Sequence, residues 1–208
     1  MKSSLTMLKR VVPLACAALF VAGAAQAALQ DRDLDGDSVI DAYYDTDLDV
    51  TWLRDTKVID NGWPSGYISW TDALAWANGL SFAGYTDWRL PKGNVACSTY
   101  DCVSSEMGHL WYTELGNSAG AMTNPGGFIW DFYSTGATYY WTSTLYDPGH
   151  AQIFEITAGY VGARVTWSTD FAMAVRDGDV PSIPEPGTYA LMLAGLAWLT
   201  LVARHRPR

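Results

Sequence analysis

The chain has 208 residues and a formal net charge of −9, and its composition is 49% hydrophobic and 17% charged. These values exclude a disordered chain and a coiled coil, and the length gives room for one ordinary domain with short additional segments. The charge is uneven, because residues 28–183 hold 7 basic and 21 acidic side chains while both ends of the chain are basic. The acidity of residues 28–183 argues against a nucleic-acid partner.

Residues 1–27 have the pattern of a secretory signal peptide. A basic start precedes the apolar run 11–23, and residues 25–27 (Ala-Gln-Ala) match the small-residue cleavage pattern. We therefore expect signal peptidase to release a mature chain that begins at Ala28, with an uncleaved membrane anchor as the alternative. An exported chain would meet an oxidising compartment.

Residues 28–42 form an acidic leader whose carboxylates are spaced like those of an EF-hand calcium loop. Gly36 stands at the turn position of such a loop, but the twelfth position, normally Glu, is Ala42. Calcium is therefore a candidate ligand, and the alternative is a solvated acidic segment that keeps the chain soluble. The candidate calcium ligands are Asp31, Asp33, Asp35, Asp37 and Asp41.

Residues 43–180 contain nine of the ten tryptophans and are predicted to be the folded domain. Early strands are expected around an Asp-rich turn, and two helices follow where apolar residues recur every three or four positions. The pattern then changes to alternation of apolar and polar residues, which predicts an antiparallel sheet. The predicted strands are 43–45, 50–53, 139–144, 151–157, 160–167 and 171–176, and the predicted helices are 71–80 and 104–115. This order of elements predicts an α+β fold.

Cys97 and Cys102 are the two cysteines that remain after removal of the signal peptide. In an exported chain an even number of cysteines favours a disulfide. A bridge that closes so short a loop would stabilise the fold by ~2 kcal/mol.

Two short motifs are compatible with catalysis but are better explained by structure. Residues 116–120 spell G-x-S-x-G, yet a predicted helix precedes them where a nucleophile elbow requires a strand, so we expect a turn. Glu106 and His109 have the Glu-x-x-His spacing of di-iron bundles, but a single copy cannot hold two metals. Because no complete catalytic set is visible, we predict that the domain is not an enzyme.

The end of the chain has three parts: a linker at 181–186, an uncharged apolar run at 187–203 and a basic tail at 204–208. As a helix the apolar run would be about 25 Å long, the short limit for a membrane span, and the arginines of the basic tail would stay cytoplasmic. A buried core helix is the alternative. The tail resembles the PEP-CTERM sorting signal of Gram-negative bacteria that produce exopolysaccharide. The sorting residues in that signal are Pro184, Glu185 and Pro186.

This resemblance implies a partner, a membrane protease of the exosortase type that acts near the Pro-Glu-Pro triplet. The chain would be held transiently in the inner membrane and would then reach the cell surface or the extracellular matrix.

Four segments of the middle resemble the Lcl C-terminal domain family: residues 70–73 (Trp-Thr-Asp-Ala), 84–91 (Gly-Tyr-Thr-Asp-Trp-Arg-Leu-Pro), 140–144 (Tyr-Trp-Thr-Ser-Thr) and 174–176 (Ala-Val-Arg). The resemblance covers roughly residues 43–180. It implies a single C-type-lectin-like domain with two helices and an antiparallel sheet, related to formylglycine-generating enzymes. The relation to those enzymes also implies an alternative role for the cysteine pair, in redox chemistry or copper binding.

The abundant aromatic residues point to a sugar ligand, because a flat ring can cover the apolar face of a sugar; the alternative is that they fill the core. The candidate glycan-binding residues in predicted loops are Trp63, Tyr67, Tyr85, Tyr100, Trp130 and Tyr133. The adhesin that gives the family its name binds sulfated polysaccharides, but the acidity of this chain disfavours anionic ligands unless a cation bridges. We expect a non-enzymatic module that binds a glycan or exopolysaccharide component. The alternatives are a structural matrix protein without a discrete ligand and an enzyme on the related fold.

Overall fold

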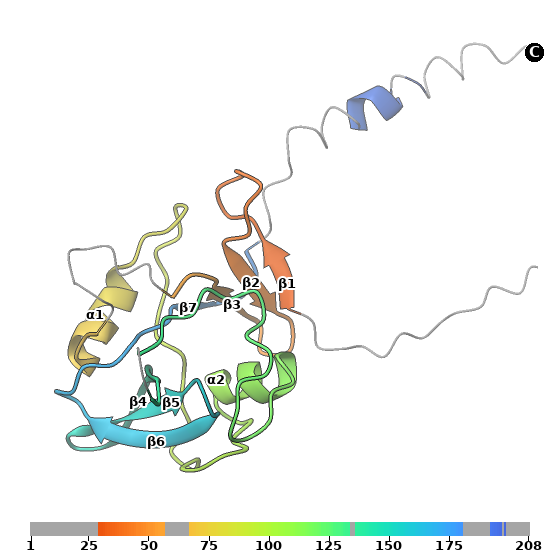
Figure 1. The fold of residues 1–208 in the computed structure, drawn as a ribbon. Coiled ribbons are helices and arrows are strands. Elements are labelled where there is room, and N and C mark those ends of the chain that lie inside the picture. The colour runs from red at the N-terminus through yellow and green to blue at the C-terminus, as the bar shows by residue number, and fades with distance from the viewer. Residues whose placement is uncertain (1–28, 57–66, 134–135, 181–191, 197, 199–208) are drawn as a thin grey trace, which may run out of the picture.

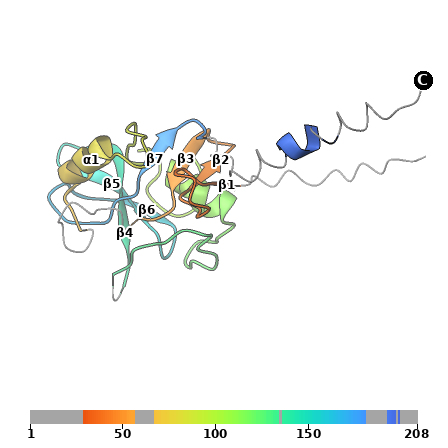
Figure 2. The same ribbon diagram turned by 90° about the horizontal axis from the view of Figure 1, so that it is seen from above.

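The computed structural model describes residues 29–56, 67–133, 136–180, 192–196 and 198. It has an α+β architecture with two antiparallel sheets, as Figures 1 and 2 show. The strands are β1 (Leu29–Arg32), β2 (Ala42–Asp45), β3 (Val50–Leu53), β4 (Tyr139–Asp147), β5 (His150–Glu155), β6 (Tyr160–Val165) and β7 (Val175–Asp177). The helices are α1 (Trp70–Gly79), α2 (Glu106–His109) and the π-helical turn η2 (Leu110–Glu114).

The first sheet has the strand order β1-β2-β3-β7, and every neighbouring pair is antiparallel. Its two central strands are apolar and almost fully buried, with Trp52 of β3 completely enclosed. β1 lies within the segment predicted as an acidic leader, and it pairs with β2 from Leu29 opposite Asp45 to Arg32 opposite Ala42. The leader is therefore partly integrated into the domain.

The second sheet contains β4, β5 and β6 in sequence order, and all three strands were predicted. The prediction of a single sheet is wrong. The predicted strand 171–176 forms regular pairs only in its last part, β7, which continues to Asp177 and joins β3 of the first sheet. The preceding residues cross between the sheets, since Trp141 N donates to Phe171 O while Leu53 N donates to Ala174 O. One segment thus links both sheets through a shared core.

Helix α1 confirms the prediction for residues 71–80 to within one residue. The Ser69 hydroxyl caps it by accepting a hydrogen bond from Asp72 N, which satisfies one of the free amides of the first turn. Ala73 and Ala77 face the core, and their small side chains let the helix lie close to the second sheet, where Trp141 is buried in the same cluster.

The second predicted helix, 104–115, is shorter and less regular than expected. It begins at Glu106 behind a Ser105 cap and widens into η2, where Leu115 N bonds to Leu110 O across five residues. Gly108 is required here, since a Cβ atom at this position would overlap the Cys102 carbonyl oxygen. The spacing of apolar residues in 104–115 is compatible with an α-helix and with a π-helix. It therefore could not indicate the π-helical turn.

The Cys97–Cys102 disulfide is confirmed, with Cα atoms 5.7 Å apart. The fully buried Gln152 of β5 holds the bridged loop in place. Its amide nitrogen donates to Asn94 O at 2.7 Å and to Cys97 O at 2.9 Å, and its amide oxygen accepts from Asn94 N at 2.7 Å. The loop is therefore anchored to the second sheet as well as cross-linked within itself.

Within the described residues, no helix has the length and apolar character needed to cross a membrane. Residues 192–196 are helical, but most of the predicted span 187–203 lies outside the described residues. The predicted signal peptide 1–27 and the sorting residues Pro184, Glu185 and Pro186 also lie outside them. The transmembrane span therefore stays a prediction.

Candidate functional site

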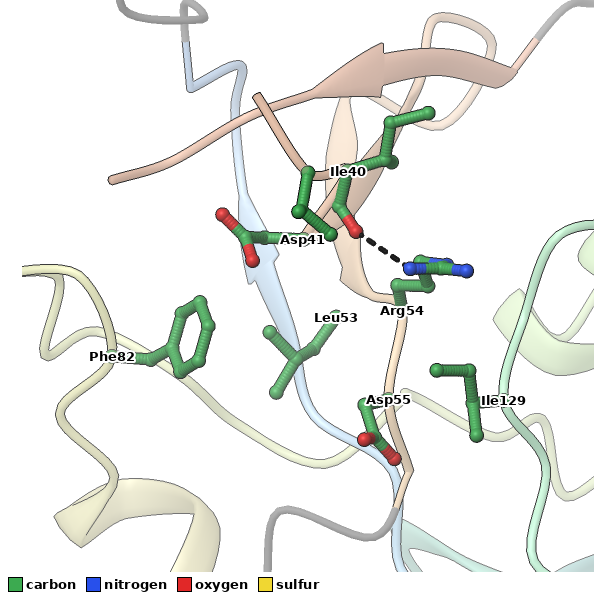
Figure 3. Close-up of a pocket in the computed structure, with 8 residues that line it drawn as sticks. Ile40, Asp41, Leu53, Arg54, Asp55, Phe82 and Ile129 are labelled. Carbon is green, nitrogen blue, oxygen red and sulfur yellow. Dashed lines mark hydrogen bonds between the residues drawn. The ribbon is translucent and has the colours of Figure 1, made fainter. Parts of the chain in front are cut away.

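A cavity of about 290 Å³ opens beside the first sheet, where the β1–β2 connection and the end of β3 meet two distant loops (Figure 3). Its walls are largely apolar, with Phe82 and Leu53 on one side and Ile129 on the other. Three charged residues, Asp41, Arg54 and Asp55, also line it. The volume is at the lower edge of the range of roughly 300–1,000 Å³ that is usual for small-molecule sites.

The charged groups of this cavity already hold the surrounding backbone. The Arg54 guanidinium donates to Ile40 O at 3.0 Å and to Gly127 O at 2.9 Å, which ties the β1–β2 connection to a loop more than 70 positions later. Asp41 Oδ2 accepts from Leu34 N at 2.8 Å. Burial raises the pKa of the Asp41 carboxyl, and the neighbouring aspartates raise it further. The Arg54 and Asp41 side chains are therefore already engaged in hydrogen bonds that hold the cavity walls together.

The candidate calcium ligands divide into separate groups in the structure. Asp33, Asp35 and Asp37 each present a carboxylate oxygen within 4.8 Å of the others, in the loop between β1 and β2. Asp31 lies on β1 outside this group, and Asp41 is engaged with the Leu34 amide. The calcium prediction stays a prediction, with three of its five residues gathered at one point.

A second group of possible ligands was not predicted. Asp45, His109 and Glu114 each offer one ligand atom within 4.8 Å of the others, and His109 Nε2 lies 3.2 Å from Glu114 Oε1. The Glu114 side chain is only 1% exposed. Burial raises the pKa of its carboxyl, and the charge of Asp45 raises it further, while His109 opposes the shift. Sequence reasoning missed the group because Asp45 and Glu114 are 69 positions apart.

The predicted glycan-binding aromatics do not form one surface. The prediction that Trp130 lies on the surface is wrong, because this residue is only 6% exposed. Its indole N–H donates to Pro125 O, and its ring packs in the same buried cluster as Trp52 and Trp111. Tyr67 and Tyr133 stack with ring centroids 4.8 Å apart, and both pack against buried Phe171. Trp130, Tyr67 and Tyr133 therefore pack against the core although they lie outside the helices and strands. Their predicted position in loops did not imply that their side chains were exposed.

The remaining candidates are more varied. Tyr85 lies under the Arg176 guanidinium at 5.0 Å, beside the Arg176–Asp87 ion pair. Tyr100 is 46% exposed and contacts Tyr160 edge to face. Trp63 lies outside the described residues. Tyr100 is therefore the most exposed of the predicted residues that the structure describes.

Three further large apolar side chains are exposed near the end of the second sheet where the β4–β5 hairpin turns. Trp167 is 78% exposed, and Tyr146 and Leu145 are each about half exposed. Thr166 N donates to Gly149 O, which brings the Trp167 segment to the tip of the hairpin. We call Leu145, Tyr146 and Trp167 the hairpin-end patch. Sequence reasoning missed Trp167 because alternation assigned it to the strand 160–167, whereas β6 ends at Val165 in a tight turn.

Ser118 and Glu106, from the two weak catalytic motifs, take part in a turn and in an ion pair. Ser118 of the G-x-S-x-G motif is exposed in a turn after η2, with Gly116 in the left-handed region at φ 63°, as the turn interpretation predicted. Glu106 is held by Arg89 through two hydrogen bonds of 2.8 Å, and Arg89 also pairs with Asp177. The bidentate pair joins α2 to the segment around Arg89, which itself bridges to Val175 of β7.

Residues 41–176 match the family of Lcl C-terminal domains, which is most of the chain. The chain belongs to this family. The matched range contains both sheets except for β1 and the last residue of β7, so the Lcl C-terminal domain corresponds to the folded core described above. No curated protein matches this chain.

Proposed function

We propose that this chain is an exported, non-enzymatic module of the cell envelope or matrix that binds a neutral glycan at the hairpin-end patch. The observation that carries the proposal is the exposure of Trp167, 78% of which faces solvent at the end of the second sheet. Exposed large apolar side chains on neighbouring segments are typical of interaction sites.

The chemistry of the patch fits a sugar better than a protein core. An indole and a phenol ring offer flat apolar faces to the C–H face of a sugar, and the Tyr146 hydroxyl can hydrogen-bond to sugar hydroxyls. The neighbouring Asp147 and His150, whose side chains are 2.6 Å apart, add further polar groups. The acidic charge of the domain disfavours anionic polysaccharides, so the proposed ligand is a neutral chain of an exopolysaccharide.

The proposal also covers how the chain reaches the cell envelope and which type of α+β fold it has. The signal peptide at 1–27 would export the chain, the helix at 187–203 would hold it in the inner membrane, and an exosortase-type protease would process it at 184–186. These steps rest on the sequence patterns of the two ends. A C-type-lectin-like arrangement is supported by membership of the Lcl C-terminal domain family and by the α+β architecture.

A glycan array probed with the purified full chain tests this proposal. We expect binding to neutral polysaccharides, and a Trp167→Ala variant should bind about tenfold more weakly, which corresponds to ~1.4 kcal/mol. Val95→Ala, which truncates a half-exposed aliphatic side chain elsewhere, is the matched control and should bind normally.

Two results would contradict the proposal. Absence of binding to every glycan would favour a structural matrix protein without a discrete ligand. Binding that is lost in Tyr100→Ala but retained in Trp167→Ala would move the site to the other end of the second sheet, where Tyr100 contacts Tyr160.

A further inference from the structure

We propose that Asp45, His109 and Glu114 form a binding site for a divalent transition-metal ion, with zinc as the ion that fits best. One ligand atom from each residue lies within 4.8 Å of the other two. The distance between His109 Nε2 and Glu114 Oε1 is 3.2 Å. Zinc–ligand bonds of about 2.1 Å in tetrahedral geometry place neighbouring ligand atoms about 3.4 Å apart, so this pair already has nearly the required separation.

An unpartnered buried atom points independently to a missing ligand. Glu114 Oε2 has no hydrogen-bond partner among the described residues, although the side chain is almost completely buried. Leaving such a group unsatisfied destabilises the folded state, and more strongly if the group is charged. A bound cation would satisfy this carboxylate and would also neutralise its repulsion with Asp45.

The Asp45 carboxylate is positioned to share the ion. Its Oδ1 accepts from the backbone amides of Asp47 and Leu48 at 3.1 and 3.0 Å, which fixes the carboxylate at the end of β2. Its Oδ2 accepts a long bond of 3.4 Å from Trp52 Nε1 and keeps a lone pair for coordination. The group is rigidly held, as an ordered metal ligand must be.

The unusual helix geometry brings the other two ligands together. In a regular α-helix, residues five positions apart differ in direction by about 140°, so His109 and Glu114 would point to different sides. The π-helical turn η2 spans residues 110–114 and places both side chains in contact. Single π-turns occur frequently at functional sites, so the departure from regular α-helix is itself consistent with a ligand here.

The donor set selects the class of ion. One imidazole nitrogen and two carboxylates suit zinc and similar first-row ions, whereas calcium and magnesium prefer oxygen ligands alone. Asp47 Oδ2 lies 3.9 Å from His109 Nε2, and this side chain is half exposed. The fourth position of a tetrahedral site is therefore open to water or to Asp47, on the side that faces solvent.

Calorimetry with zinc chloride on the purified, chelator-treated full chain tests the site. We expect one ion per chain, with an affinity that falls at least tenfold in His109→Gln and in Glu114→Gln. Cobalt(II) should bind in place of zinc and give the strong visible absorption of a tetrahedral complex. That absorption should disappear in the same variants while their near-UV circular dichroism stays that of the wild type, which separates loss of ligation from general loss of stability.

Matched controls distinguish this site from other acidic and histidine-containing surfaces. His150→Gln removes the other described histidine, which pairs with Asp147 at 2.6 Å, and Asp35→Asn weakens the cluster in the β1–β2 loop. Both variants should retain zinc affinity. If Glu114→Gln alters the near-UV circular dichroism of the protein, the test relies on His109→Gln alone. The His109 side chain is partly exposed, so its replacement disturbs the core less than replacement of Glu114.

The proposal fails if the chain shows no heat with millimolar zinc and no cobalt absorption. It also fails if affinity persists in His109→Gln, or if it is lost in His150→Gln or Asp35→Asn instead. Failure on these terms would leave the proposed glycan site untouched, because the hairpin-end patch shares no residue with the metal ligands.

Discussion

Replacement of Asp170 by Asn is expected to change how the stability of the domain depends on pH. Asp170 is completely buried ahead of the segment that links the two sheets. Its Oδ1 accepts from the Tyr133 hydroxyl at 2.9 Å, and Arg164 Nε lies 3.1 Å from Oδ2. Burial raises the pKa of the carboxyl to about 6, even though both partners lower it. The loss of hydration therefore outweighs the two favourable contacts.

The direction of the effect follows from proton linkage. The folded state holds the Asp170 proton more tightly than the unfolded chain, in which the pKa of an Asp side chain is about 3.9. The resulting stabilisation is complete below about pH 4 and is lost as the pH rises through about 6. Two pKa units correspond to about 3 kcal/mol. The side chain introduced by Asp170→Asn cannot titrate, so the unfolding free energy of the wild type relative to this variant should fall by up to about 3 kcal/mol between pH 4 and 7.

Urea denaturation of both proteins at several pH values between 4 and 7 measures this difference directly. The corresponding change in the relative melting temperature is roughly 6–12 °C. Asp101→Asn serves as the control, because this aspartate is exposed and its positive φ of 60° suits Asn equally well. A wild-type minus Asp170→Asn difference that stays constant from pH 4 to 7 would refute the assignment of a buried, proton-binding carboxyl.

Three further predictions address the disulfide, the leader and the tail. Replacing both Cys97 and Cys102 by Ser should lower the unfolding free energy by ~2 kcal/mol in urea denaturation, and equal stability would contradict the entropic argument. Calcium should bind the β1–β2 loop only weakly, on the order of 10⁻⁴ M or poorer, and calorimetric heat that survives Asp33→Ala with Asp35→Ala would count against the loop. Replacing residues 184–186 by Ala should leave a membrane-retained chain in cell fractionation, and release at the normal rate would disprove the sorting role.

Local chemistry explains why several elements could be predicted from the sequence. Ser69 and Asp72 mark the start of α1 because a hydroxyl and a first-turn carboxylate stabilise free helix amides wherever the helix packs. The β4–β5 hairpin follows from alternation around an Asp-Pro-Gly turn. The disulfide was predicted from the even number of cysteines together with the predicted export, and the family from short motifs. Each of these signals can be read from short stretches of chain without knowing how they pack.

The sequence by itself thus determined the α+β class, the main elements, the cysteine pairing and the family, because the forces responsible act between neighbours in the chain. Only the tertiary structure decided that β7 joins β3, that Trp130 is buried while Trp167 is exposed, and that Glu114 meets Asp45. Those outcomes depend on which distant segments pack against each other and on the residue at which a strand ends. A pattern of apolar residues indicates that a side chain is buried, but it does not identify the partner that covers it.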